Sequence, residues 1–200
     1  MHLRLAGIGH WFDPARVLFT GLDADLHPGG VYGVTGPSGS GKSTLLSLLA
    51  GWEPPRQGRI VRSGVERVQW VFQNPHGVPR RTVLDHVALP FVARGSSRGE
   101  ADECAQELLV RFRLEALSDH LFGALSGGEA QRLMLARGVA AAPDLLLVDE
   151  PTAQLDRHTA TEVNAVLASL SAQGRIVVVA THDLQTQAMC TSLIDLEAYA

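Results

Sequence analysis

The sequence predicts an α/β fold with a parallel sheet, and three stretches carry this prediction. Residues 31–35 are an apolar run that leads into a glycine-rich loop, and residues 45–50 after the loop have helical character. Two further apolar runs, 145–148 and 176–180, are short enough to be strands that are buried on both faces of a sheet. A strand, a glycine-rich loop and a helix, followed by buried strands, are typical of an α/β domain.

Length and composition limit the class of protein. The 200 residues suffice for one domain, and the net charge of -4 argues against a general nucleic-acid binder. Cys104 and Cys190 lie far apart and predict free thiols of a reducing compartment. The first residues lack the apolar core of a signal peptide, and no apolar run approaches the ~20 residues of a membrane span. We therefore expect no nucleic-acid partner and no direct membrane insertion.

The N-terminal part predicts short strands around the glycine-rich loop. Residues 3–8 and 17–22 are expected as strands, with a turn at 10–14 between them. Residues 59–62 and 68–72 are expected as further strands. This part therefore predicts a series of short strands on both sides of the loop.

The middle of the chain changes in character. Residues 82–90 predict a short helix that ends at its proline, 95–99 a polar linker, and 100–112 a second helix with apolar residues at helical spacing. We expect a helical subdomain inserted into an α/β core. The predicted limits within a single domain of 1–200 are 74–137 for the helical subdomain and 1–73 and 138–200 for the core.

The core pattern resumes after this insertion. A helix is predicted to open at Gly127 and end before Pro143, and the strand 145–148 follows. Residues 157–172 predict a helix that Gly174 caps, and 176–180 predict another buried strand. The chain closes with a short helix and a weak strand at 192–196.

The glycine-rich loop fits the phosphate-cradling pattern G-x-x-x-x-G-K-S/T at every fixed position. Its residues are Gly36, Pro37, Ser38, Gly39, Ser40, Gly41, Lys42, Ser43 and Thr44. Backbone N–H groups and the following helix N-terminus would face the phosphates, and Lys42 would reach the β- and γ-phosphates. The Ser43 hydroxyl would ligate Mg²⁺. A glycine-rich turn with an incidental lysine is the alternative, but the strand and helix around the loop favour a nucleoside triphosphate site.

Polar residues follow three of the predicted strands. Asp149 is placed to hold Mg²⁺, and Glu150 to act as general base on the attacking water. His182 would hydrogen-bond the γ-phosphate, and the Gln73 amide would reach Mg²⁺ or the attacking water. Solvated carboxylates and a structural histidine are the alternatives.

A second cluster of small residues precedes a helix at 125–132, in the sequence Leu-Ser-Gly-Gly-Glu-Ala-Gln-Arg. Its backbone donors suit phosphate, yet one nucleotide does not need two such clusters from one chain. Two copies placed head to tail would let the second cluster of one copy close over the nucleotide of the other.

Taken together, these motifs resemble, in order and spacing, the nucleotide-binding subunit of ATP-binding cassette (ABC) transporters. The resemblance is carried by the loop 36–44, Gln73, residues 125–129, residues 145–150, Ala153-Gln154-Leu155-Asp156 and His182. The resemblance spans almost the whole chain. It implies a P-loop NTPase (RecA-like) core with an N-terminal antiparallel β subdomain and an inserted helical subdomain. It also implies an ATPase with ATP and Mg²⁺ as cofactors.

The resemblance implies roles for individual residues. The catalytic set would be Glu150, His182 and Gln73, and Mg²⁺ would be held by Ser43, Gln73 and Asp149. The opposite subunit's ATP would be bound in trans by Ser126, Gly127, Gly128 and Glu129, and Asp156 would lie in the D-loop at the dimer interface. An aromatic from the first turn would stack on adenine; Phe12 is favoured because it continues an alternation with Ile8 and His10, and Trp11 is the alternative.

The sequence departs from the family pattern at Ala130, Gln154 and Gly138. Gly138 should weaken its helix by ~0.5–1 kcal/mol. None of these departures removes a phosphate or water contact.

The function that follows is the ATP-binding and ATP-hydrolysing subunit of an ABC transporter. Its expected partners are transmembrane permease subunits and a second cassette, identical or related. Its expected place is the cytoplasm, at the inner face of the cell membrane, held there by the membrane partner. Residues 82–90 resemble the lipoprotein-release and macrolide-efflux group. Two alternatives are a soluble ABC ATPase that acts on DNA or the ribosome, and a small-molecule kinase with a phosphate loop.

Overall fold

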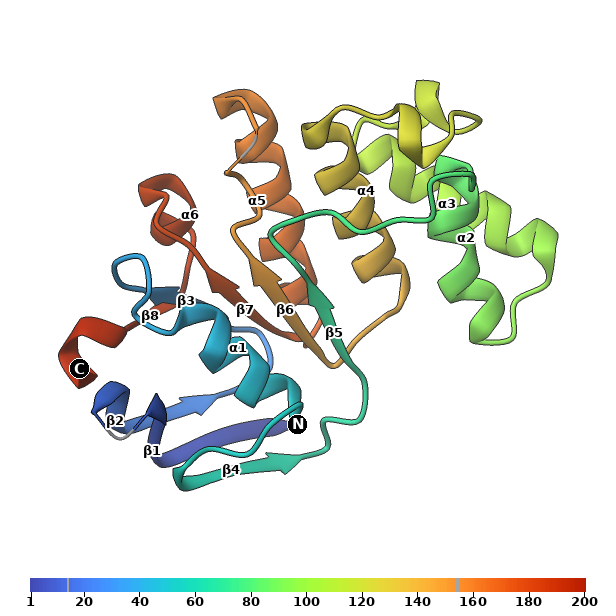
Figure 1. The fold of residues 1–200 in the computed structure, drawn as a ribbon. Helices are drawn as coiled ribbons and strands as arrows, with labels where there is room; N and C mark the ends of the chain where they lie inside the picture. Colours follow the sequence, from blue (N-terminus) through green and yellow to red (C-terminus); the bar gives the residue numbers. More distant parts are fainter. Residues whose placement is uncertain (14, 154) are drawn as a thin grey trace.

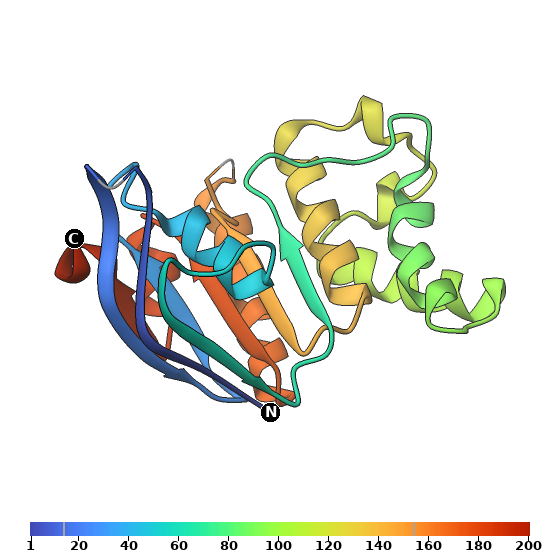
Figure 2. The ribbon, with the colours of Figure 1, turned by 60° about the horizontal axis from the view of Figure 1, so that its bottom comes forward.

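The computed structural model of the chain describes residues 1–13, 15–153 and 155–200. A parallel sheet lies between an antiparallel sheet on one side and a group of helices on the other (Figure 1, Figure 2). The elements run in the order β1 (His2–Asp13), β2 (Arg16–Leu26), β3 (Val31–Thr35), α1 (Lys42–Ala50), β4 (Gln57–Ser63), β5 (Val68–Val71), α2 (Val83–Ala93), α3 (Arg98–Arg111), η1 (Glu115–Leu117), η2 (Phe122–Ala124), α4 (Gly127–Ala140), β6 (Leu145–Asp149), α5 (Arg157–Ala172), β7 (Ile176–Ala180), α6 (Leu184–Ala188), β8 (Ser192–Asp195) and η3 (Leu196–Tyr199).

The parallel sheet has the strand order β5-β6-β7-β3-β8, and every neighbouring pair in it is parallel. All residues of β6 and β7 are buried, as expected for strands that are covered on both faces. The predicted strands at 31–35, 145–148 and 176–180 and the predicted helix at 157–172 are confirmed. The α/β fold class is therefore correct.

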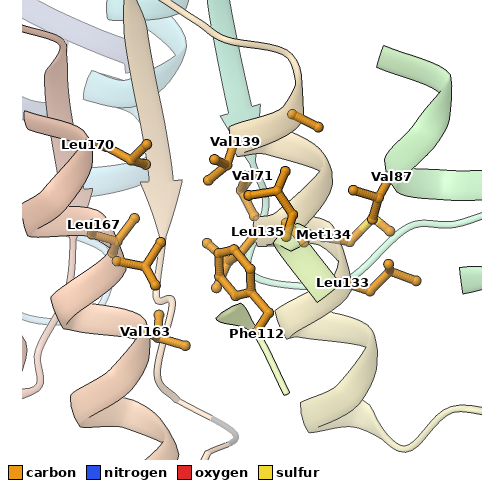
Figure 3. Packing of buried hydrophobic residues seen from close by; sticks show 14 of the residues in the cluster. Val71, Val87, Phe112, Leu133, Met134, Leu135, Val139, Val163, Leu167 and Leu170 are labelled. Carbon is orange, nitrogen blue, oxygen red and sulfur yellow. The ribbon is translucent and has the colours of Figure 1, made fainter. Parts of the chain in front are cut away.

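The two faces of the sheet pack into two different cores because alternate strand residues point to opposite sides. Leu145 and Leu147 join the leucines of α1 and the apolar residues of the antiparallel sheet. Leu146 and Val148 face the other way and join the apolar residues of α4 and α5. Figure 3 shows part of this second core, in which Met134 of α4 lies between Val71 of β5 and Val87 of α2. The sheet is thus fixed from both sides, and its strand ends are fixed with it.

The antiparallel sheet has the order β2-β1-β4 and is longer than the sequence suggested. The predicted turn at 10–14 is wrong for residues 10–13, because β1 continues to Asp13 and pairs there with Arg16 of β2. Pro14 lies outside the described residues. Register shifts interrupt this pairing between Leu5 and Asp13, so the alternation of apolar residues is broken and the strand looked shorter than it is.

The helical segment follows β5 and corrects two expectations. Pro90 lies inside α2 and does not end it, although a proline costs a helix interior about 3 kcal/mol. The loss is offset because Val83, Val87 and Ala88 of this helix are fully buried in the core. The predicted linker 95–99 is shorter, because Ser97 and Glu100 form a capping box and α3 begins at Arg98.

The proposed division of the core from the helical subdomain at residue 137 stays a prediction. α4 runs unbroken across that position to Ala140. Gly138 brings this helix against the sheet: a Cβ at this residue would lie 2.7 Å from Val71 Cγ2 of β5. The end of α4 therefore belongs to the packing of the parallel sheet.

Candidate nucleotide-binding site

An open cleft of about 970 Å³ lies where β3, β5, β6 and β7 end. Residues after the carboxyl ends of parallel strands share one edge of a sheet, and ligands of α/β proteins bind there. The cleft is lined by the loop between β3 and α1, together with Gln73, Asp149, Glu150 and His182. The four strand-end residues that the sequence singled out are thus brought together with the glycine-rich loop.

The loop has the backbone shape that its glycines allow. Gly36, Gly39 and Gly41 have φ values of 136°, 83° and 97°, a region that disfavours residues with a Cβ. Gly41 is also the N-cap of α1, and it supplies no side-chain hydrogen bond to the first turn. The N-terminal N–H groups of α1 are therefore available to an anion.

Lys42 points into this loop. Its ammonium Nζ donates to the carbonyl oxygens of Gly36, at 2.8 Å, and of Pro37, at 3.0 Å. These two bonds hold the ammonium beside the N-terminus of α1. The positive charge of Lys42 and the N-terminus of the helix would then attract a phosphate together.

Ser40 is the one residue of the loop 36–44 that does not line the cleft. Its buried hydroxyl has no hydrogen-bond partner within the described residues, and it lies 2.6 Å from the point where a Cβ on Gly36 would stand. The Ser40 side chain therefore lies against Gly36 within the loop. Its role in ATP binding stays a prediction.

Ser43 and Asp149 meet across the cleft. The Ser43 hydroxyl donates to Asp149 Oδ2 at 2.6 Å, although 106 residues separate the two in the sequence. Burial raises the pKa of Asp149, the hydrogen bond from Ser43 opposes the rise, and the neighbouring Glu150 charge adds to it. The pair places a hydroxyl and a buried carboxylate side by side, facing the phosphate loop.

Glu150 is 7 % exposed and lies just beyond β6 with a φ of 48°, in the left-handed region. Such a conformation costs a residue with a Cβ about 1–3 kcal/mol. It turns the carboxylate toward the end of β7, where the Thr181 hydroxyl donates to Oε2 at 3.3 Å. The backbone N–H of His182 also donates to Oε2, at 3.4 Å, and its ring Nδ1 to Oε1, at 2.8 Å.

Gln73 follows β5 and lines the cleft from the side of the helical segment. Its neighbour Phe72 is tied to α4, because Gln131 Nε2 donates to the Phe72 carbonyl oxygen at 3.4 Å. Gln131 is 1 % exposed. Phe72, the residue before Gln73, is therefore held by α4, the helix that begins at Gly127.

Phe12 lines the cleft and Trp11 does not, among the residues that the structure describes there. Phe12 is 67 % exposed at the end of β1, and its ring meets the His10 ring edge to face. The sequence reasoning missed Asp13, Arg16 and Leu18, which also line the cleft. Asp13 falls in the predicted turn 10–14 and Leu18 in the predicted strand 17–22, and the pairing of Asp13 with Arg16 in the β1–β2 hairpin becomes visible only in the structure.

The second small-residue cluster is not part of this cleft. None of the described residues that line the cleft belongs to 125–129. Ser126 and Glu129 instead form a capping box: the Ser126 hydroxyl donates to Glu129 Oε2 at 2.7 Å, and its oxygen accepts from the Glu129 backbone N–H at 3.4 Å. Hydrogen bonds from Ser126 lower the pKa of Glu129. Within one chain this cluster starts α4, which lies beyond β5 on the side of the helical segment (Figure 2).

Asp156 is the N-cap of α5 and accepts from the backbone N–H groups of His158 and Thr159. Gln154 lies outside the described residues. None of the helices in the described parts of the chain combines the length and apolarity that crossing a membrane requires.

Comparison with known proteins identifies the family. The sequence profile described as "ABC transporter" matches residues 19–153. The chain is 38% identical over 191 residues to an ABC transporter ATP-binding protein of Mycobacterium bovis, covering 88% of this chain and 58% of that protein. The chain thus spans less than two thirds of the mycobacterial relative. It is 36% identical over 178 residues to the lipoprotein-releasing system ATP-binding protein LolD of Chromohalobacter salexigens, covering 81% of this chain and 75% of LolD.

A solved structure has the same fold. It is a dimeric ATP-binding cassette in a post-hydrolysis state, bound to ADP and Pi, with a TM-score of 0.86 and 28% identity. The match covers 96% of this chain and 93% of that one. The profile match and the relatives agree with the phosphate loop, the strand-end residues and the cluster at 125–129, and the chain therefore belongs to the ABC transporter family, as one of its ATP-binding cassettes.

Proposed function

We propose that the chain binds ATP with Mg²⁺ in the cleft and hydrolyses it to energise transport by transmembrane permease subunits. The observation that carries the proposal is the pairing of Ser43 with Asp149 beside Glu150. A phosphate loop, a hydroxyl and carboxylate pair and a second carboxylate are the parts that phosphoryl transfer to water requires.

The residues of the cleft fit Mg²⁺. Ser43, Asp149 and Gln73 offer hydroxyl, carboxylate and amide oxygens, which are the donors that Mg²⁺ prefers. The described residues contain no group of three His, Cys, Asp or Glu side chains suited to a metal, so phosphate and water oxygens would complete the set. The buried Asp149, whose pKa is raised, would be favoured in its ionised form beside a dication. When bound, the ion would neutralise charge on the phosphate oxygens.

Glu150 is the proposed general base. Water attacks the γ-phosphorus, Glu150 takes a proton from the water, and the bond from the γ-phosphorus to the bridging oxygen of ADP breaks. Three donors from residues 181 and 182 hold the Glu150 carboxylate in place. His182 has a side chain that is 72% exposed toward the cleft side, and its second ring nitrogen can face the γ-phosphate.

A second cassette completes the site in this proposal. Ser126, Gly127, Gly128 and Glu129 form a helix start that does not line the cleft of their own chain. In a head-to-tail pair they would bind the γ-phosphate of the partner's ATP. The partner cassette is a second copy of this chain or a related one.

An aromatic patch next to Gln73 supports a protein partner. It consists of Trp52, Trp70 and Phe72. The ring centroid of Trp70 lies 4.8 Å from that of Trp52 and 4.8 Å from that of Phe72. Trp52 is 66% and Phe72 37% exposed. Exposed apolar patches of this kind mark interaction sites. We assign the patch to a permease subunit, which would hold the cassette at the inner face of the membrane and act on Gln73.

The transport role is favoured over a soluble ABC ATPase acting on DNA or the ribosome, because the relatives are named as transporter ATP-binding proteins. The similarity to LolD further supports the lipoprotein-release and macrolide-efflux group.

The test combines ATP hydrolysis with purification from membranes. A tagged chain extracted from membranes with mild detergent should bring down a protein with several membrane spans, and the complex should hydrolyse ATP only with Mg²⁺. Ribosomes or DNA in the purified fraction would support the soluble class instead. A membrane complex that hydrolyses no ATP would contradict the assignment of Glu150.

A further inference from the structure

A buried polar network lies behind the loop that carries His182. Its members are Thr152 in the turn after β6, Asn164 in α5, Asp183 just before α6, and Thr186 within α6. Thr152, Asn164 and Thr186 are 6%, 5% and 0% exposed. Buried polar groups of this kind are costly unless each has a partner, and here they meet one another across three segments of the chain.

The Thr186 hydroxyl is the centre of this network. Its oxygen lies 2.8 Å from Asp183 Oδ2, 3.1 Å from Thr152 Oγ1 and 3.2 Å from Asn164 Nδ2. A hydroxyl has one proton to donate, and the shortest of these contacts is to the carboxylate. Thr186 therefore donates to Asp183 and accepts from Thr152 and Asn164.

The net effect on Asp183 agrees with this direction. Burial would raise the pKa of Asp183, but hydrogen bonds from the side chain and backbone of Thr186, the backbone of Gln185 and the side chain of Thr152 together outweigh it and lower the pKa. Asp183 is thus an ionised acceptor on which the network ends.

Asp183 connects the network to the proposed catalytic residues. Its backbone N–H donates to the Thr181 hydroxyl at 3.0 Å, and that hydroxyl donates to Glu150 Oε2 at 3.3 Å. His182 lies between Thr181 and Asp183 in the sequence, and its ring contacts the Glu150 carboxylate. Hydrogen bonds on the two ends of Asp183, its carboxylate and its backbone N–H, therefore link Asn164 in α5 to Glu150.

The geometry points to Thr186 as a positioning residue for ATP hydrolysis, which fixes the loop 181–183, and through it Glu150 and His182, against α5. This inference rests on the proposed function. Its physical reason is that Glu150 has a positive φ and that the His182 side chain is mostly exposed, so both depend on support from behind the loop. A position error of about 1 Å in a catalytic group can cost about 10²-fold in rate.

The test compares Thr186→Val, which keeps the shape and removes the hydroxyl, with Thr186→Ser, which restores the hydroxyl. The turnover number of the chain, or of its complex with the co-purified membrane partner, is measured together with the Kd for ATP. We expect Thr186→Val to lower turnover about tenfold and to leave the Kd for ATP within about twofold, because the hydrogen bonds of Thr186 among the described residues go to Thr152, Asn164 and Asp183 and not to the loop 36–44. Thr186→Ser should recover most of the turnover.

Ser171→Ala is the matched control, because Ser171 of α5 is buried as well, and its hydroxyl, among the described residues, donates to the carbonyl of Ala168 in its own helix and to no residue of the network. It should keep wild-type turnover. Thr152→Val should reproduce the loss if Thr186→Val does not fold. The inference is overturned if a folded Thr186→Val or Thr152→Val protein turns over ATP at the wild-type rate, if its turnover and ATP affinity fall together, or if Thr186→Ser is no better than the valine variant. A wild-type protein that hydrolyses no ATP would overturn the proposed function, and this role with it.

Discussion

The Nδ1 nitrogen of His182 lies 2.8 Å from Oε1 of Glu150, and this contact joins the ends of two neighbouring parallel strands. A carboxylate accepts, so Nδ1 carries the proton. The other ring nitrogen of His182 is then the one left to face a phosphate. The proposed base and the proposed phosphate ligand are therefore oriented by each other.

Replacing Glu150 by glutamine should trap the ATP-bound state. Glutamine has nearly the same shape but cannot take a proton from water, and general-base catalysis is worth about 10²–10⁴-fold in rate. We expect Glu150→Gln to bind ATP, to lose turnover by about that factor, and to elute as a dimer in size-exclusion chromatography with ATP. Glu162→Gln on α5, a carboxylate paired with Arg113 outside the cleft, should behave as the wild type. A Glu150→Gln protein that stays monomeric with ATP would count against the head-to-tail pair.

Removing the ammonium of Lys42 should abolish tight ATP binding. Lys42 supplies the positive charge inside the loop, where two carbonyl oxygens hold it. Isothermal titration of Lys42→Ala with ATP should show no saturable binding at concentrations that saturate the wild type, with an unchanged thermal transition. Arg59→Ala, which removes an exposed positive charge on β4, should leave the affinity unchanged. Wild-type affinity in Lys42→Ala would disprove the site.

Phe12 should contribute to the affinity for the base and not to the affinity for the phosphates. Stacking of a base on an aromatic ring is worth about 1–3 kcal/mol. We expect Phe12→Ala to weaken ATP binding by a corresponding factor while inorganic triphosphate competes as well as before. Trp11→Ala should change neither, because Trp11 is not among the residues lining the cleft. The opposite pattern would make Trp11 the stacking residue.

Gly138→Ala should destabilise the protein, although alanine is the better helix former. The helix would gain about 0.5–1 kcal/mol, but the added Cβ would lie 2.7 Å from Val71 Cγ2, and such overpacking costs about 1–3 kcal/mol. Gly99→Ala in α3 is the matched change, because its Cβ would meet nothing within 4 Å. Urea denaturation should show a lower free energy of unfolding for the first variant and a higher one for the second. Equal gains in both would remove the packing reason for Gly138.

Asp156 should stabilise the protein only while it is ionised. Hydrogen bonds from the side chain and backbone of Thr159 lower its pKa from 3.8 to about 2. A carboxyl with a lowered pKa in the folded state stabilises above its unfolded pKa, and this contribution is lost as the pH falls toward about 2. Asp156→Asn keeps a capping side chain without the titration. The difference in unfolding free energy between wild type and variant should therefore shrink between pH 5 and pH 2, and a constant difference would contradict this cause.

The core of the candidate site was predictable because its signals are local or follow from strand direction. The three positive-φ glycines of the loop lie in the same short stretch, 36–44, as Lys42 and Ser43. Asp149 and His182 each follow a short apolar run, and parallel strands bring such positions to one edge whatever the loops between them do. The contact between Ser43 and Asp149, 106 positions apart, follows from this rule without any knowledge of the chain between them.

The remaining parts depend on tertiary packing that no local pattern reveals. Arg16 was missed because β1 has register shifts, so its pairing with β2 could not be extrapolated from the alternation of apolar residues. Pro90 was expected to end a helix that core packing carries to Ala93. The network around Thr186 joins residues from α5, α6 and the turn after β6, and each of them alone is an unremarkable polar residue in a helix or turn.

The contact of Lys42 with the carbonyl oxygens of Gly36 and Pro37 has a further consequence for covalent modification. Lys42 is the only lysine in the 200 residues. Here acylation of the single lysine side chain would remove the charge that the phosphate loop depends on. An acetyl group on any lysine of this chain would therefore report a cassette that cannot hold ATP tightly, and bound nucleotide would shield that amine from the reaction.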